Sequence, residues 1–316
     1  MTVPAFCRYS PNYHHRDVHF PLPAIDLAGR SEGLWGQRMR IGIIDYLLRG
    51  RDSMLPHLAR ELGLDSYELS VHLVGDPTRL LCDPERPADL VYLNKAAGVA
   101  VSSLFAIQFL GQNLLDTDPV RRRPASLAVK GLFERACSIG ASVVVLPLLG
   151  ASDIRGDEEL MALTELLPIW TRWAESLDVA VAIKTSLHSE QILRMIEDFP
   201  PPHLGLSFDP ALLTAIGRDP RAEWKKVADR AIHIHLQDRM RSGVAAALGE
   251  GEVPLADVID EIVSTEYAGT IVLSTPAGDH PKEVARRNRV YLERLLTLAH
   301  QKRTQNLQAP ALLPKA

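Results

Sequence analysis

Three apolar runs in the second half of the chain point to a parallel sheet: VAVAIKTS at 179–186, HLGLSFDPA at 203–211 and AIHIHLQD at 231–238. Each run is apolar almost throughout instead of alternating, which is typical of strands that are covered on both faces. A stretch with helical spacing of apolar residues follows each run. The pattern therefore predicts successive strand–helix units.

The same alternation extends over most of the chain. Five further runs complete the set: RIGIIDYLL at 40–48, SYELSVHLVG at 66–75, GVAVSSLFAIQF at 98–109, ASVVVLPLLG at 141–150 and GTIVLSTPA at 269–277. Eight such units predict an α/β fold, a closed (β/α)8 TIM barrel, whose right-handed crossovers place the helices outside. An open doubly wound sheet is the alternative. The first run lacks the GxGxxG turn that would favour it.

Helix start and stop signals fall between these runs. One helix is expected to begin at Asp118 with Pro119 and to stop at Gly140. Another opens at Ser189, a third opens after Pro254, and a long basic amphipathic helix is expected at 281–300.

Composition excludes several classes of protein. The chain has 316 residues, of which 46% are hydrophobic, and a formal net charge of −4. This size accommodates one barrel with extensions or two ordinary domains. The mixed charges do not build the basic surface of a nucleic-acid-binding protein. Three scattered cysteines without a CxxC pair indicate reduced thiols. No stretch has the apolar core of a signal peptide or a membrane span, so we expect a cytoplasmic protein.

The chain divides into three parts. Residues 1–38 are rich in Pro, His and Arg without a helix or strand period, which indicates an N-terminal extension. The barrel is expected at 39–300, and a C-terminal tail at 301–316. The extension contains histidines without Cys or Glu partners at ligand spacing, so we expect solvated side chains there and no metal site: His14, His15 and His19.

Polar residues close most of the apolar runs. The active site of a TIM barrel lies at the C-terminal ends of the strands, and buried charges there are costly unless they are paired or used. These residues are therefore the candidates for a site: Asp45, Tyr46, His72, Gln108, Lys184, His188, Asp209, His233, His235, Asp238 and Ser274.

Several segments resemble the xylose isomerase-like TIM barrels. That superfamily contains sugar isomerases, sugar-phosphate isomerases and epimerases, and apurinic endonuclease relatives. AIHIHLQDR resembles the "HvHlKD" strand of the family, LGEGEVPLADVIDEI its "GeGdvd" loop and helix, and EYAGTIVL its "GyxGxxxlE" strand. Upstream, LGLSFDPALLTAIGRDP resembles "vGlxxDpgHl", and LDVAVAIKTSLH stands at the "valEpH" strand. NLLDTDPVRRRPASLAVKGLFERACSIGASVVVLP is similar to the third helix and fourth strand. The resemblance covers about residues 40–300.

The resemblance implies a divalent metal, Mn, Co, Zn or Mg, held by Glu, Asp, His and Glu from the last four strands. The matching positions here are Lys184, Asp209, His235 and Ser274. The family histidine of "DpgH" is Leu212, and the lysine of "HlKD" is Gln237. The four positions sum to zero charge instead of −3. An ammonium about 4 Å from a divalent ion repels it by roughly 8 kcal/mol at an effective dielectric constant of 20. We therefore expect no tightly bound metal and no other cofactor.

Three interpretations of Lys184 stay open. Its ammonium can replace the metal by pairing with Asp209 and polarising a substrate carbonyl or phosphate. It can form a Schiff base with a carbonyl substrate, as a lyase or aldolase does. It can also be a salt bridge in a site that has lost its chemistry.

The other candidates receive supporting roles. We expect His235 to face the barrel axis as a general base or acid and His233 to point toward the helix layer. Asp209 and Asp238 are expected to orient reacting groups, and Asp238 is expected to pair with Arg239 and hold the GEGE loop. Substrate-binding candidates are Asp45, His72, Gln108, His188, Arg239 and Ser274.

Two functions are compatible with these residues, and a third lacks the residues that it needs. The first is a sugar isomerase- or epimerase-like enzyme that moves a proton next to a carbonyl of a small polyhydroxylated substrate. The second is a catalytically inactive barrel that binds a sugar-like ligand or regulates another process. The third, an apurinic endonuclease, requires a metal cluster and a basic DNA-binding face that the sequence lacks. The expected partner is a small molecule, not nucleic acid or a membrane, and a homo-oligomer is compatible with the sequence.

Overall fold

The computed structural model describes residues 39–72 and 87–308. The expected extension at 1–38, with its three histidines, lies outside these residues. Within the described part, no helix combines the length and the apolar character needed to cross a membrane.

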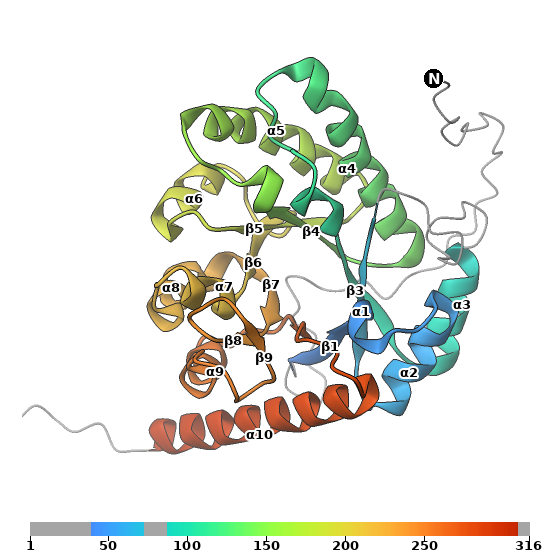
Figure 1. Ribbon diagram of the computed structural model, residues 1–316, viewed down its shortest axis with the longest axis vertical. Helices are drawn as coiled ribbons and strands as arrows, with labels where there is room; N and C mark the ends of the chain where they lie inside the picture. The colour runs from blue at the N-terminus through green and yellow to red at the C-terminus, as the bar shows by residue number, and fades with distance from the viewer. Residues whose placement is uncertain (1–38, 73–86, 309–316) are drawn as a thin grey trace, which may run out of the picture. The chain divides into compact units, whose positions relative to one another are not determined.

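Eight parallel strands form a closed barrel in the order β1-β10-β7-β6-β5-β4-β3-β2 (Figure 1). The last strand pairs with the first, with Arg40 opposite Thr270 and Ile43 opposite Leu273. This closure confirms the predicted TIM barrel and excludes the open sheet. The strands are β1 Arg40–Ile44, β2 Ser66–Ser70, β3 Ala100–Phe105, β4 Val143–Leu148, β5 Ala180–Thr185, β6 Leu204–Phe208, β7 Ala231–Leu236 and β10 Thr270–Leu273.

Helices follow the strands and surround the barrel (Figure 1). They are α1 Asp45–Leu48, α2 Leu55–Glu61, α3 Pro87–Ala97, α4 Pro119–Ile139, α5 Asp157–Ser176, α6 Ser189–Ile196, α7 Pro210–Ala215, α8 Pro220–Val227, α9 Leu255–Ser264 and α10 Pro281–Gln308. A two-stranded ribbon, β8 Asp238–Arg239 with β9 Ala245–Ala246, follows β7.

The helix signals in the sequence are confirmed. The Asp118 side chain accepts a hydrogen bond from the backbone N–H of Val120 at the start of α4, and Gly140 ends the helix in the left-handed conformation, with φ of 74°. The basic helix α10 continues to Gln308, past residue 301, where the composition indicated the start of a tail.

The strands are buried on both faces, and β2, β4 and β6 contain only buried residues. A polar side chain in such a strand has no water to bind and must find a partner inside the protein. The polar residues Glu68 on β2, Ser103 on β3, Ser207 on β6 and His233 on β7 are all buried. Their hydrogen bonds define the site described next.

Candidate functional site

Lys184, at the end of β5, projects into the barrel. Its Nζ lies 2.7 Å from Oδ2 of Asp209 and 2.9 Å from Nδ1 of His235. The same nitrogen stands 5.6 Å from the centre of the Phe105 ring on β3. Only 5% of the residue is exposed. The ammonium is therefore surrounded by side chains from β3 and β7 and by Asp209, directly after β6, as expected for a residue on the barrel axis.

Asp209 follows β6 and has two functions in the structure. Its Oδ1 accepts hydrogen bonds from the backbone N–H groups of Ala211 and Leu212 and so caps α7. Its Oδ2 faces Lys184. Burial acts to raise the pKa of this carboxyl group, but the Lys184 ammonium, with His235 and the backbone N–H of Leu212, lowers the pKa below its usual value. Asp209 is therefore a carboxylate paired with Lys184.

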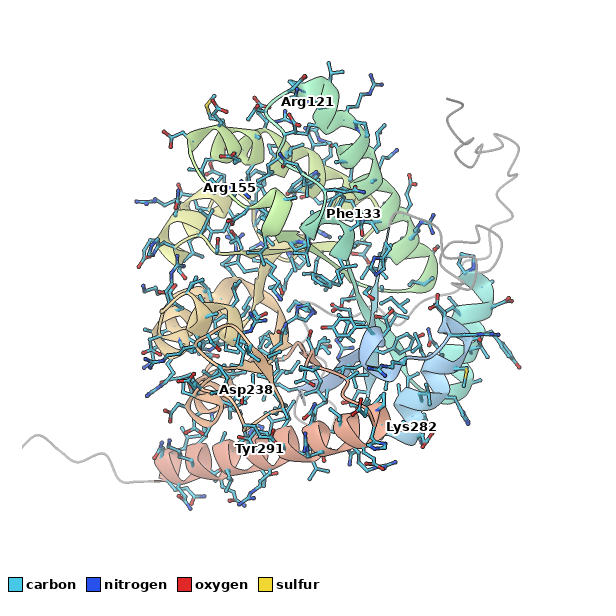
Figure 2. The ribbon with its side chains drawn as sticks, in the orientation of Figure 1. Arg121, Phe133, Arg155, Asp238, Lys282 and Tyr291 are labelled. Atoms are coloured by element: carbon cyan, nitrogen blue, oxygen red, sulfur yellow. The ribbon has the colours of Figure 1, made fainter. Side chains whose placement is uncertain are left out.

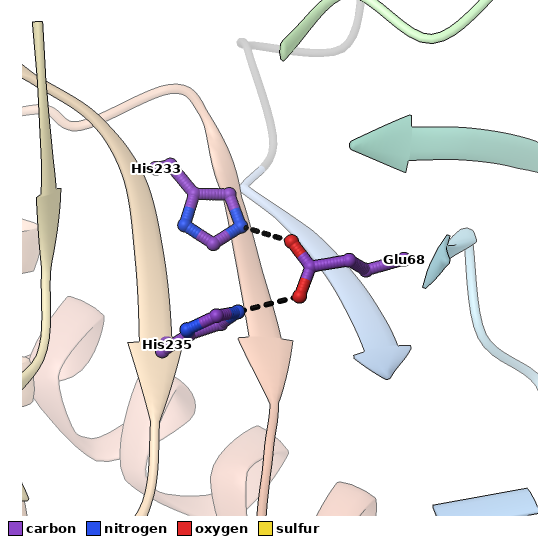
Figure 3. A group of neighbouring side chains, drawn as sticks. All are labelled: Glu68, His233 and His235. Carbon is purple, nitrogen blue, oxygen red and sulfur yellow. Dashed lines mark hydrogen bonds and ion pairs between the residues drawn. The ribbon is translucent and has the colours of Figure 1, made fainter. Parts of the chain in front are cut away.

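His233 and His235 both point into the barrel, where they contact the carboxylate of Glu68 (Figure 3). Nε2 of His233 lies 2.9 Å from Oε2, and Nε2 of His235 lies 2.5 Å from Oε1. The expectation that His233 points toward the helix layer was wrong. Side chains two residues apart on a strand lie on the same face, so the two histidines share one.

Both ring nitrogens of His235 are occupied, Nδ1 by Lys184 and Nε2 by Glu68. The side chain is fully buried, and its ring meets Phe105 edge to face at 5.1 Å between centres. Burial lowers the pKa of His235 to about 4, although Glu68 acts in the opposite direction. The imidazole is therefore neutral at pH 7, and it has no free nitrogen for a substrate.

The low pKa of His235 predicts a pH-dependent stability. A histidine in the unfolded chain titrates near pH 6.5, so between pH 6.5 and about 4 the unfolded state binds more protons than the folded state. The stabilising contribution is fully present above pH 6.5 and is lost as the pH falls to 4, a change of roughly 3 kcal/mol. Urea unfolding measured from pH 7.5 to 4.5 should show this decrease, and His235→Gln should reduce it. Equal slopes in both proteins would contradict the assignment.

Glu68 was not among the residues expected from the sequence. Its side chain is completely buried, and Oε2 also accepts a hydrogen bond from Ser103 Oγ at 2.7 Å. Burial acts to raise its pKa, but contact with the two histidines lowers it below the usual value. A signal was available in SYELSVHLVG, where a carboxylate stands in the middle of an apolar strand and therefore needs a buried partner.

Above Lys184, Gln237 connects several groups at the rim of the barrel. Its Nε2 donates to Asp209 Oδ2 at 3.3 Å and to Ser274 Oγ at 3.4 Å, and its Oε1 accepts from Arg239 Nη2 at 3.1 Å. Ser274 Oγ lies 2.6 Å from the hydroxyl of Tyr46, a residue that is 40% exposed. Burial of the phenol raises the pKa of Tyr46 to about 12. Tyr46 and Arg239 thus connect the buried ion pair to the surface.

Asp238 holds the loop after β7 and does not reach Lys184. Its carboxylate accepts hydrogen bonds from the backbone N–H groups of Gly249, Gly251 and Val253. Figure 2 labels Asp238 beside Tyr291 of α10, and Gly249 packs closely against the Tyr291 ring. The predicted loop-holding role is confirmed, but the expected side-chain pairing with Arg239 is not, because that guanidinium binds Gln237.

Replacement of Asp238 by Ala should release this loop. Three backbone N–H groups, the buried one of Val253 and the partly buried ones of Gly249 and Gly251, would lose a charged acceptor. The loss should cost about 1.5–3 kcal/mol of unfolding free energy. Urea unfolding measures the loss, and hydrogen exchange should become faster at the amides of Gly249, Gly251 and Val253. The exposed Asp229, replaced by Ala, is the control and should change neither. Unchanged exchange in Asp238→Ala would contradict this account of the loop.

The remaining candidates are dispersed around the rim. Asp45 is buried and accepts a hydrogen bond from Ser70 at 2.5 Å. Gln108 is buried in a short 3-10 helix, Ile107–Leu110, and among the described residues its side-chain amide has no hydrogen-bond partner. His72 lies beyond the end of β2, and His188 precedes α6. Both histidines are exposed and lie outside the buried cluster.

A sequence profile of the xylose isomerase-like TIM barrel matches residues 56–295. The chain belongs to this family. No curated protein gave a significant sequence match.

Solved structures of the same fold include several epimerases. A D-tagatose 3-epimerase-like protein superposes with a TM-score of 0.70 and 19% identity, over 84% of this chain and 99% of that one. L-ribulose 3-epimerase gives 0.72 and 15%, over 88% and 100%. The 3-keto-D-glucoside 4-epimerase YcjR from E. coli gives 0.66 and 15%, over 81% and 99%. At these identities the likeness establishes the shared barrel fold alone.

The four positions that the family resemblance assigns to a metal do not suit one in this xylose isomerase-like barrel. The Lys184 ammonium lies between Asp209 and His235 and contacts both. Ser274 offers a neutral hydroxyl that is already bonded to Tyr46. A catalytic metal generally keeps three protein ligands, and here the two ligand-type side chains bind an internal cation.

Deeper in the barrel, Glu68, His233 and His235 have the composition of a metal site. Their ligand atoms lie within 4.8 Å of one another. In the structure, however, both histidines are hydrogen-bonded directly to the Glu68 carboxylate. An ion there would have to replace both contacts and compete with the ammonium on the far side of His235.

Proposed function

We propose that this protein is a sugar isomerase- or epimerase-like enzyme that works without the family's divalent metal. Its substrate would be a small polyhydroxylated or carbonyl compound, and the reaction a proton transfer at the carbon next to the carbonyl. One observation carries the proposal: the Lys184 ammonium occupies the C-terminal end of the barrel between Asp209 and His235. The family and fold support the substrate class.

Lys184 would supply the positive charge that stabilises the oxyanion formed when the proton leaves. A fixed charge in a dry site acts strongly on a developing anion because no solvent has to reorganise. Asp209 Oδ2 contacts this charge, and the Tyr46 hydroxyl is connected to Asp209 at the rim through Ser274 and Gln237, so we assign the moving proton to these two groups. Both ring nitrogens of His235 are already engaged, so His235 would hold Lys184 in place and leave proton transfer to the rim groups.

A ligand-binding or regulatory barrel is the second candidate. This candidate is favoured because the polar groups of the cluster already bind each other: Lys184 contacts both Asp209 and His235. A Schiff-base lyase is less well supported, because Nζ of Lys184 already contacts Asp209 and His235 and a nucleophile needs a free lone pair.

Solvent-proton exchange tests the enzyme proposal. Protein dialysed against a chelator is incubated in deuterium oxide with a panel of aldoses, ketoses and their phosphates, and deuterium next to the carbonyl is measured by NMR. We expect incorporation with at least one compound and loss of it in Lys184→Met. Lys130→Met, which removes an exposed helix pair with Glu134, is the matched control and should retain it.

Each other outcome of this experiment has a defined meaning. Exchange that appears only after manganese, cobalt or zinc is added would contradict the metal-free proposal. Binding of a panel compound, seen as a thermal shift, without exchange would favour the ligand-binding barrel. A borohydride-trapped adduct at Lys184 would favour the lyase.

A further inference from the structure

We propose that Glu68 is a positioning residue that sets the tautomer of His235 and thereby holds the Lys184 ammonium on the barrel axis. Glu68, His235 and Lys184 form a chain of contacts, with 2.5 Å between Oε1 and Nε2 and 2.9 Å between Nδ1 and Nζ. They come from β2, β7 and β5, so the chain of contacts crosses the interior of the barrel. The expected effect of Glu68 on catalysis rests on the proposed function, whereas the tautomer of His235 rests on the contacts alone.

The chemistry of the two ends determines the tautomer. An ammonium group only donates hydrogen bonds, so Nδ1 of His235 must present a lone pair to Lys184. A carboxylate only accepts, so Nε2 must carry the hydrogen that faces Glu68. The neutral Nε2–H form of His235 satisfies both contacts. The Nδ1–H form would set donor against donor at Lys184 and lone pair against carboxylate at Glu68.

The surroundings of Glu68 hold its carboxylate in this orientation. Oε2 accepts from Ser103 Oγ at 2.7 Å and from His233 Nε2 at 2.9 Å. Ser207 Oγ lies 2.9 Å from Nδ1 of His233 and fixes the other side of that ring. A single assignment of hydrogens therefore satisfies the whole chain, from Ser207 through His233, Glu68 and His235 to Lys184.

The arrangement is equivalent to the support that proteins build behind a metal-binding histidine. Such a histidine gives one nitrogen to the cation and donates the other N–H to a carboxylate, which fixes the ring and makes it a better ligand. Here Glu68 is the carboxylate and the cation is an ammonium of the chain itself. Loss of Glu68 should therefore act on Lys184, although the two side chains are not in contact.

The wild-type protein provides the first test. Long-range proton–nitrogen NMR correlations distinguish a ring nitrogen that carries hydrogen from one with a lone pair. For His235 we expect a protonated Nε2 and a lone pair on Nδ1, unchanged when zinc or manganese is added. A protonated Nδ1, a doubly protonated ring, or a metal-shifted Nε2 would overturn the inference, and this measurement requires neither a variant nor a substrate.

Variants then test the positioning role. Glu68→Gln keeps the shape but can turn its amide N–H toward Nε2 of His235. That contact and the Lys184 contact then require opposite tautomers, so we expect His235 to populate both. If exchange activity is found, kcat should fall at least tenfold with little change in KM. Ser103→Ala, which removes a donor from the same carboxylate without facing His235, should keep the wild-type tautomer.

The results separate this inference from the proposed function. An intact Nε2–H tautomer in a folded Glu68→Gln would show that Glu68 does not set it. The wild-type tautomer together with absence of exchange for every compound would contradict the enzyme proposal and leave the positioning role of Glu68 in place.

Discussion

Lys184→Met is expected to lower the free energy of unfolding by about 3–5 kcal/mol, because it leaves the buried Asp209 carboxylate without its counter-charge. Asp209 is 5% exposed and lies 2.7 Å from the ammonium. Methionine fills a similar volume, so the change mainly removes charge and the hydrogen bond to His235. Urea unfolding at pH 7 measures the effect.

Two further variants show whether the loss comes from the buried charge. Lys130→Met removes an exposed i,i+4 pair with Glu134 and should change stability by less than about 0.5 kcal/mol. Lys184→Met with Asp209→Asn removes both charges and should recover part of the loss. If Lys184→Met alone were as stable as the wild type, the Lys184–Asp209 pair would contribute nothing to the free energy of unfolding.

The double variant Lys184→Glu with Ser274→Glu is expected to bind a divalent ion that the wild type does not. The four matched positions would then be Glu, Asp209, His235 and Glu, and their summed charge would change from zero to −3. Removing a repulsion of roughly 8 kcal/mol and adding two carboxylates should strengthen manganese binding by about a thousandfold or more. Calorimetry and the electron paramagnetic resonance signal of manganese measure the affinity and stoichiometry.

Lys184→Gln with Ser274→Gln is the matched control, since it changes the same positions without introducing carboxylates. Its affinity for manganese should be lower than that of the glutamate pair by about a hundredfold or more, because neutral amides are poor substitutes for charged ligands. Wild-type protein that binds one manganese tightly would contradict the assignment of Lys184 as the resident cation.

The architecture was accessible from the sequence because its signals are local. Apolar runs such as VAVAIKTS marked the strands, and Asp118 and Gly140 marked the ends of a helix. Parallel strands closed into a barrel carry all their C-terminal ends to one rim. Lys184 on β5, Asp209 directly after β6 and His235 on β7 could therefore be expected to meet, and they do.

Three candidate residues lie elsewhere than their place in the sequence suggested. His72 and His188 close apolar runs in the sequence but lie exposed in the structure, because β2 ends at Ser70 and His188 already precedes a helix. Asp238 follows β7 directly, yet its carboxylate turns to the loop amides, which offer several donors at once.

The amino-acid sequence by itself determined the order of strands and helices and the rim at which charged side chains collect, because both follow from the pattern along the chain. The tertiary structure alone decided that Glu68 contacts His235. These residues are 167 positions apart on strands β2 and β7, which are not neighbours in the barrel. Their contact exists because closure of the sheet brings opposite walls within hydrogen-bonding distance, and no local pattern encodes which buried groups then face each other.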